Sequence, residues 1–230
     1  MALTLFELAG DQGRRFSPFS WRILMALRHK GLDAERVAVK FTDKDVIAFS
    51  GQDRVPILAD GDTTVSDSWA IADYLEQTRP QTPSLFSGTV GRGGAKFINA
   101  WTDLQLHPRI SRLIVRDVYD SVHPDDKAHF KETREARYGA SFDSLHETRD
   151  QHLGAMREVL APVRVALEDQ PFLCGENAAY ADYIVFGAFQ WARCASPYAL
   201  LEGHDPVHAW RERMLDVFGG FARTAPGYPV

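Results

Sequence analysis

The stretch RVPILADGDTTVSDSWAIADYLE, residues 54–76, carries the pattern that decides the fold. Two short apolar runs, 55–59 and 63–65, flank an Asp-Gly pair, which favours a tight hairpin turn. A helical pattern follows over 67–76. The proline near the start of the first run has no N–H to donate to a sheet ladder, so it is tolerated only where a strand begins or at an edge. The stretch therefore predicts a β-hairpin followed by a helix.

Upstream of this stretch, strand and helix patterns alternate. LTLFEL at 3–8 predicts a buried strand, and 18–30 has the apolar spacing of an amphipathic helix. A second strand is expected at 35–40 and a short helix at 42–49. The resulting order, β-α-β-α-β-β-α, predicts a thioredoxin-like α/β domain over residues 1–78.

Downstream of residue 78 the pattern changes completely. Residues 79–94 are rich in proline, glycine and polar residues, which predicts an interdomain linker. The remainder, 95–230, predicts an all-α helical domain in which Pro108 should kink or interrupt a helix. Residues 180–193 are almost wholly apolar, as expected of a helix at the centre of that domain. The charged segment 124–150 predicts solvated helices or a mobile excursion.

The composition excludes several classes of protein. The chain is 45% apolar with a net charge of −5, and it has no basic block that could neutralise a phosphate backbone, so we expect no nucleic-acid partner. No stretch approaches the roughly 20 apolar residues of a membrane-spanning helix, so we expect no membrane partner. The N-terminus lacks a charged region followed by a long apolar run, which predicts a cytoplasmic protein.

The cysteines and histidines do not predict a metal site. Cys174 and Cys194 are too far apart for a CxxC pair, and the eight histidines show no HxxxH spacing. An isolated histidine such as His107 is then expected to be structural. We predict no metal.

Three motifs in the first eighty residues combine into a candidate ligand site. Ser17 precedes a proline where the first strand turns into the first helix, so it either caps that helix or helps to hold an anion. Val55-Pro56 permits a cis bond and a Val55 backbone that pairs with an extended peptide, although an edge strand alone explains it. Asp67-Ser68 opens a helix and has the same two interpretations as Ser17. Their joint order in one small domain favours the ligand site.

These motifs resemble those of the glutathione transferase family. FSPFSWR at 16–22, RVPIL at 54–58 and SDSWAIADYLE at 66–76 are similar to its glutathione-binding motifs, and PFLCGENAAYADYIVFG at 171–187 is similar to its helical-domain signature. SPFSWR resembles the serine-type zeta and etherase-like classes, whereas DSWAIADYLE and YADYIVFGAFQWAR resemble the etherase-like and fungal ligand-binding classes. The resemblance covers the first eighty residues well, the last sixty moderately and the middle poorly.

The resemblance implies that Ser17 donates a hydrogen bond to the sulfur of glutathione, with Ser20 as the competing candidate. A donor at the positive end of a helix favours the thiolate over the thiol. Glutathione would then be the cosubstrate. The partners implied for its glycyl carboxylate are Arg54 and Lys40.

The rest of glutathione is expected along the other two motifs. Val55, followed by a cis Pro56, would pair with the cysteinyl backbone. Asp67 and Ser68 would hold the γ-glutamyl end. The resemblance also implies a homodimer.

The second substrate should be a small hydrophobic electrophile, and cleavage of an aryl ether is the reaction that the etherase-like motifs suggest. The side chains expected to line its pocket are Phe16, Phe19, Trp101 and Leu104. Two alternatives remain open on the same fold, a non-catalytic binding protein for apolar ligands and a scaffold protein. The sequence departs from the family where Ala179 replaces the usual Ser or Thr three residues before Asp182, which predicts a weakened helix start.

Overall fold

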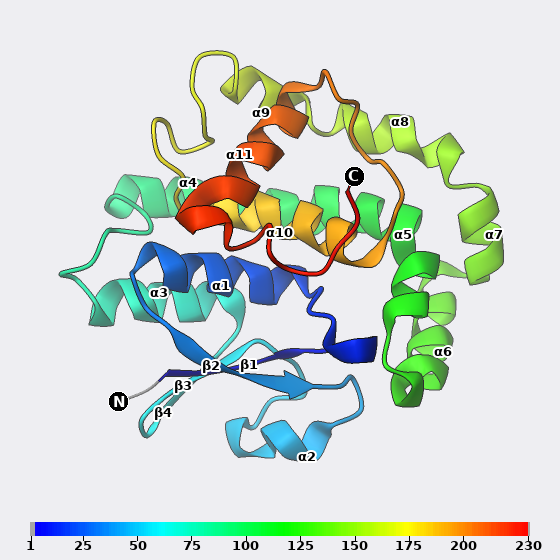
Figure 1. Cartoon of the computed structure of the whole chain (residues 1–230), viewed down its shortest axis with the longest axis horizontal. Helices are drawn as coiled ribbons and strands as arrows, with labels where there is room; N and C mark the ends of the chain where they lie inside the picture. The colour runs from blue at the N-terminus through cyan, green and yellow to red at the C-terminus, as the bar shows by residue number, and fades with distance from the viewer. Residues whose placement is uncertain (1–2, 230) are drawn as a thin grey trace.

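The computed structural model describes residues 3–229. Its first part is a four-stranded sheet with α2 on one face and α1 and α3 on the other, and its second part is helical (Figure 1). The strands are β1 (Leu3–Leu8), β2 (Ala34–Val39), β3 (Ile57–Asp60) and β4 (Thr63–Ser66). The helices and 3₁₀ turns among them are η1 (Asp11–Gly13), α1 (Pro18–His29), α2 (Lys44–Ile47), η2 (Ala48–Ser50) and α3 (Ser68–Thr78).

The sheet confirms the predicted order of elements. Its strand order is β2-β1-β3-β4, with β1 parallel to β2, and β3 antiparallel to both β1 and β4. Leu5 of β1 lies opposite Arg36 and Leu58 and is completely buried. The third strand begins at Ile57 instead of Val55, because Pro56 has no N–H and the ladder can start only beyond it.

The second part is helical, as predicted. Its elements are α4 (Thr89–Trp101), η3 (Thr102–Leu106), α5 (His107–Ser121), η4 (Pro124–Asp126), α6 (Lys127–Tyr138), α7 (Phe142–Glu147), α8 (Asp150–Glu158), α9 (Ala161–Ala166), α10 (Tyr180–Ala195) and α11 (Pro206–Gly220). The charged segment 124–150 forms α6 and α7 in place of a mobile excursion. None of the helices within residues 3–229 is long and apolar enough to cross a membrane.

The predicted linker is shorter than expected. Helix α4 begins at Thr89, so 89–94 is helical and only 79–88 connects the two parts. The glycines of this segment indicated a loop, yet Gly91 serves a close contact: a Cβ there would lie 1.9 Å from the carbonyl oxygen of Phe86. The close approach of the Phe86 carbonyl therefore explains why glycine is used here despite its low helix propensity.

The expected break at Pro108 is absorbed without separating two helices. Helices α4 and α5 join through η3, a π-helical turn, and Pro108 lies in the first turn of α5. Because helical backbone precedes Pro108, its missing N–H removes one hydrogen bond of the preceding turn, and this irregularity coincides with the π turn. Single π turns inside helices are frequent at functional sites.

Helix α10 is buried on nearly all sides, as predicted, and it packs along α1. Gly187 permits this packing, since a Cβ at that position would lie 2.5 Å from the carbonyl oxygen of Pro18. Glycine inside a helix costs about 1 kcal/mol relative to alanine. Here it allows the first turn of α1 to rest directly on α10, which fixes the start of α1.

The start of α10 depends on Asp182. Ala179 makes no side-chain cap, so half of the usual capping box is missing as expected. The fully buried Asp182 carboxylate accepts four hydrogen bonds, from the backbone N–H groups of Leu173 (2.7 Å), Cys174 (3.2 Å) and Ala179 (3.1 Å) and from the Trp210 indole (2.9 Å). This one side chain thus joins α10, α11 and the preceding loop.

Replacing Asp182 with alanine should lower the free energy of unfolding by about 3 kcal/mol or more, because each buried donor left unpaired costs about 1–3 kcal/mol. Urea denaturation followed by circular dichroism measures the change. Asp169→Ala, at an exposed aspartate, is the matched control and should stay within about 0.5 kcal/mol of wild type. A loss of less than about 1 kcal/mol for Asp182→Ala would contradict this role.

A second buried polar cluster joins the two parts of the chain. The Arg22 guanidinium of α1 is fully buried and reaches Asp103 (2.6 Å) and Asn99 (2.9 Å), while Asn99 also donates to Asp103 (2.9 Å). Partial burial of Asp103 opposes its ionisation, but the hydrogen bond from His107 and the charge of Arg22 outweigh this effect and lower the pKa of Asp103 to about 2. The carboxylate therefore stabilises the fold in its charged form.

The Arg22–Asp103 pair predicts a pH dependence of stability. Its contribution is complete above the unfolded-state pKa of Asp, about 3.9, and is lost as the pH falls toward about 2. Asp103→Asn should therefore lower the urea midpoint at pH 7, and the difference in midpoint between this variant and the wild type should be smaller at pH 3. The exposed Asp62→Asn is the control and should show no gap at either pH. A gap of equal size at the two pH values would count against an ionic role for Asp103.

Candidate active site

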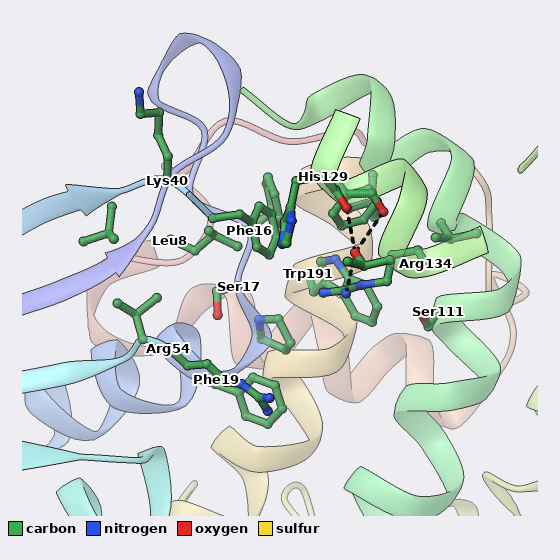
Figure 2. Close-up of a pocket in the computed structure, with 18 of the residues that line it drawn as sticks. Leu8, Phe16, Ser17, Phe19, Lys40, Arg54, Ser111, His129, Arg134 and Trp191 are labelled. Atoms are coloured by element: carbon green, nitrogen blue, oxygen red, sulfur yellow. Dashed lines mark hydrogen bonds between the residues drawn. The ribbon is translucent and has the colours of Figure 1, made fainter. Parts of the chain in front are cut away.

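A cavity of about 710 Å³ lies between the sheet-containing part and the helical part. The loop after β1, the loop after β2 and residues 53–55 line it on one side. Helices α5, α6 and α10 line it on the other side, and Figure 2 shows side chains from both sides directed toward the shared space.

Ser17 lies in the lining of this cavity and caps α1. Its hydroxyl oxygen accepts a hydrogen bond from the Ser20 N–H at 3.3 Å, and the residue is only 5% exposed. A hydroxyl has one donor and two acceptor sites, so the capping bond leaves the proton free for a ligand. Capping and ligand binding are therefore compatible in the same side chain.

Ser20 is placed differently. It is 1% exposed, is absent from the cavity lining, and its hydroxyl is buried with no hydrogen-bond partner among residues 3–229. Of the two serines that the sequence singles out, Ser17 is the one that faces the cavity (Figure 2).

The start of α1 provides further donors. Pro18 is the first helical residue, and the N–H of Trp21 already bonds to the Ser17 carbonyl at 3.1 Å. The N–H of Phe19 belongs to the first turn, where no intrahelical acceptor exists. Together with the positive end of the helix dipole, this arrangement suits an anion near Ser17.

The second motif has the predicted geometry. The Val55-Pro56 peptide bond is cis, and Val55 lies in the cavity lining. Val55 precedes the first residue of β3, so its backbone N–H and C=O are outside the sheet ladder. An extended peptide could pair with these groups.

The third motif caps α3 and lies outside the cavity lining. The Asp67 carboxylate accepts from the N–H groups of Trp69 (2.9 Å) and Ala70 (3.1 Å), and its φ of +79° is in the region that favours glycine. Such a backbone costs about 1–3 kcal/mol in a non-glycine residue and is common at ligand sites. Ser68 is buried, and its carbonyl accepts from the Tyr180 hydroxyl at 2.7 Å.

The two cations predicted to meet a carboxylate differ in availability. The Lys40 ammonium lies 2.8 Å from Asp125 and 3.4 Å from Asp43, and its hydrogen bond to Asp125 raises the pKa of Lys40. Arg54 has an 88% exposed side chain, and the one ion pair that it forms within residues 3–229 is with the neighbouring Asp53, at 3.5 Å. Both residues line the cavity, but Lys40 is already neutralised by two carboxylates.

Two of the four residues predicted to line an electrophile pocket lie in the lining of this cavity. Phe16 and Phe19 are in the cavity lining, whereas Trp101 and Leu104 are not, and Leu104 is 70% exposed. The reason is helical periodicity: Asp103 and His107 face the cavity, so Leu104, one position further along, is turned away from it.

The helical lining also contains residues that the sequence analysis did not select. They come from η3, α5, α6 and α10: Asp103, Ser111, Phe130, Thr133, Arg134, Arg137 and Trp191. Phenylalanine and arginine at i, i+4 and i+7 along α6 were visible as one helical face, but a charged segment without a known neighbour indicates solvent exposure equally well.

His107 faces the same cavity and is held by its surroundings. It is 9% exposed, its Nδ1 lies 3.3 Å from Asp103, and its ring packs edge-on against Phe19 and Trp191. Burial lowers the pKa of His107, so the imidazole is neutral near pH 7. Its Nε2 is buried with no hydrogen-bond partner in the described part of the chain.

Comparison with known proteins agrees with this architecture. Residues 16–78 match the model of the glutathione S-transferase N-terminal domain, and residues 95–212 match that of the C-terminal domain. Glutathione S-transferase 4 of Zea mays is 26% identical over 210 residues, covering 86% of this chain and 83% of its own. A zeta-class glutathione S-transferase of Euphorbia esula is 27% identical, covering 56% of this chain and 60% of its own.

Solved structures show the same fold. Glutathione transferase GSTFuA3 of Phanerochaete chrysosporium superposes with a TM-score of 0.78 at 23% identity, covering 97% of this chain and 94% of its own. A glutathione S-transferase of Ceriporiopsis subvermispora, solved in complex with glutathione, gives 0.77 at 19% identity, covering the same shares. With both domain models matched in order and the fold shared over 97% of the chain, this protein belongs to the glutathione S-transferase family.

Proposed function

We propose that the chain is a glutathione transferase that activates the thiol of glutathione and transfers it to a hydrophobic electrophile. The observation that carries the proposal is the position of Ser17, whose hydroxyl lies at the cavity surface and at the N-terminus of α1. A thiolate there receives a hydrogen bond from the hydroxyl and is stabilised by the helix dipole.

The remaining motifs place the rest of glutathione in this proposal. The Val55 backbone pairs with the cysteinyl unit, and the N-terminus of α3 at Asp67-Ser68 receives the γ-glutamyl end. Arg54 binds the glycyl carboxylate. Its exposed guanidinium supports this assignment more strongly than the ammonium of Lys40, which Asp125 and Asp43 already hold.

The electrophile lies in this proposal between Phe16, Phe19 and the helical wall. Holding it beside the thiolate replaces a bimolecular encounter by an oriented one. For an aryl ether, the sulfur attacks the carbon that carries the aryloxy group, the C–S bond forms as the C–O bond breaks, and the phenoxide leaves and takes up a proton. The resemblance of SPFSWR and YADYIVFGAFQWAR to etherase-like proteins supports this class of electrophile.

Removing the Ser17 hydroxyl tests the proposed activity. Ser17→Ala should lower kcat/KM for the conjugation of 1-chloro-2,4-dinitrobenzene by about 10²–10³, the loss expected for one donor to a developing or stabilised anion. Ser20→Ala is the matched control and should retain activity, since its hydroxyl is buried away from the cavity. Equal activity of wild type and Ser17→Ala would refute the role of Ser17, and glutathione binding without turnover of any electrophile would favour a binding protein.

We also propose that the protein forms a homodimer through α4. Val90, Phe97 and Leu104 are 91%, 70% and 70% exposed, and they recur every seven residues along α4 and η3. Apolar side chains at this spacing form a stripe along one helix face. A continuous row of exposed apolar side chains is typical of a protein–protein interface. In a homodimer with two-fold symmetry, the stripe of one subunit would pack against the same stripe of the other.

Phe97→Glu should convert the dimer into a monomer, because it places a charge within the apolar stripe. Size-exclusion chromatography with light scattering measures the mass of each variant. Val165→Glu provides the control, as Val165 of α9 is 63% exposed and distant from α4 in sequence, and this variant should remain dimeric. A monomeric wild-type protein would contradict the proposal.

A further inference from the structure

The wall of the cavity formed by α6 carries a positive charge that the glutathione site does not use. Arg134 and Arg137 both line the cavity, together with Phe130 and Thr133 of the same helix. Figure 2 shows Arg134 on the side of the cavity opposite Lys40 and Arg54. The helix therefore presents a basic surface to the space where the second substrate is expected.

Arg134 is held in place without a counter-ion. Its guanidinium packs over the rings of Phe41 and Phe130, at 5.9 and 5.1 Å from their centroids, and one N–H donates to the Thr133 hydroxyl at 3.2 Å. No carboxylate within residues 3–229 forms an ion pair with it. Burial and the nearby charge of Arg137 lower the pKa of Arg134, which means that the charged guanidinium is under-stabilised as it stands. A guanidinium has five N–H donors in a planar fork, so most of them remain available.

The acidic residues of the cavity do not compensate this charge. Asp53 and Asp103 are the carboxylates in the lining, and they pair with Arg54 (3.5 Å) and Arg22 (2.6 Å) respectively. A half-buried arginine that stacks on aromatic rings and lacks a carboxylate partner is well suited to bind a planar anion.

We propose that Arg134 binds the carboxylate of an aromatic electrophile, so that the enzyme prefers acidic aromatic substrates over their neutral analogues. This inference rests on the proposed function of the site. The aromatic body of the substrate occupies the space between Phe16, Phe19 and Trp191, and its carboxylate reaches the guanidinium on α6. The ligand class is thus an aromatic carboxylate with a leaving group that faces Ser17.

The test compares 4-chloro-3-nitrobenzoate with its methyl ester. In both, the thiolate sulfur forms a bond to the ring carbon, and chloride leaves with the electron pair of the C–Cl bond. Arg134→Gln should lower kcat/KM for the benzoate about 10- to 100-fold, chiefly through KM, and change that for the ester less than about twofold. Arg134→Lys, which keeps the charge but loses the planar fork, should fall between wild type and Arg134→Gln.

Lys131→Gln is the matched control, because Lys131 is an exposed cation of the same helix and lies outside the cavity lining. It should leave both substrates unaffected. An equal loss on the ester and the benzoate in Arg134→Gln would overturn the proposal. The proposal would also be overturned if Arg134→Gln raised the KM for glutathione and left the ratio of kcat/KM for the benzoate to kcat/KM for the ester unchanged. Arg134 would then bind a carboxylate of glutathione.

A binding measurement that needs no turnover distinguishes failure of this inference from failure of the proposed enzymatic function. Quenching of tryptophan fluorescence by 3,5-dinitrobenzoate and by 3,5-dinitrobenzamide reports occupancy of the cavity, which Trp191 lines. We expect the wild type to bind the benzoate at least about tenfold more tightly than the amide, and Arg134→Gln to abolish this preference. Equal affinities in the wild type would overturn the inference even if the enzyme is active.

Discussion

The contact between the first turn of α1 and the buried helix α10 is the constraint on which the rest of the structure depends. Gly187 lets the Pro18 carbonyl approach α10 to a distance that no side chain would permit. Because Ser17 immediately precedes Pro18, its position relative to the helical part follows from this contact. The Arg22–Asp103 cluster strengthens the same junction one turn later. The cavity between the two parts is therefore a consequence of how α1 and α10 pack.

The two sides of the cavity differ in how they are built. The sheet-containing side presents backbone groups and a helix N-terminus, which suit a peptide-like ligand, together with the side chains of Phe16, Phe19 and Arg54. The helical side presents side chains from α5, α6 and α10, which can change without disturbing the sheet. In our proposal, changes on the helical side can alter the choice of electrophile while the groups that hold glutathione stay in place. In our proposal, Arg134 of α6 is the residue through which this protein selects its second substrate.

Local patterns predicted the sheet-containing part well because each motif there reports a local constraint. A few neighbouring residues suffice to identify each of them: a proline that cannot join a sheet ladder, an Asp-Gly turn, and a serine that caps a helix. The nearly all-apolar run of α10 was equally clear. The apolar sequence of α10 did not indicate that α1 is the helix packed against it. The one sign of a close contact was Gly187, a glycine within a helical pattern.

Contacts in the folded structure decide what the sequence could not show. The glycines at 91–94 indicate a loop in the sequence, but the Phe86 carbonyl lies beside Gly91 in the structure. The sequence predicts Leu104 as a pocket residue, but η3 turns Asp103 toward the cavity instead. Lys40 matched a carboxylate-binding role by position, but Asp125, eighty-five residues away, occupies its ammonium. The neighbour of Lys40 lies far along the chain, where periodicity carries no information, whereas the other two cases depend on how a single helix turn is placed against its surroundings.

The pKa of the bound glutathione thiol tests the central claim most directly. The thiolate absorbs in the ultraviolet, so a pH titration of the complex, with free protein and free glutathione subtracted, gives this pKa. A thiol placed at the N-terminus of α1 beside the Ser17 hydroxyl should titrate about one unit or more below the value of about 8.5 for a free cysteine thiol. A bound thiol that titrates at about 8.5 would contradict the account, because the start of α1 would then not stabilise the thiolate.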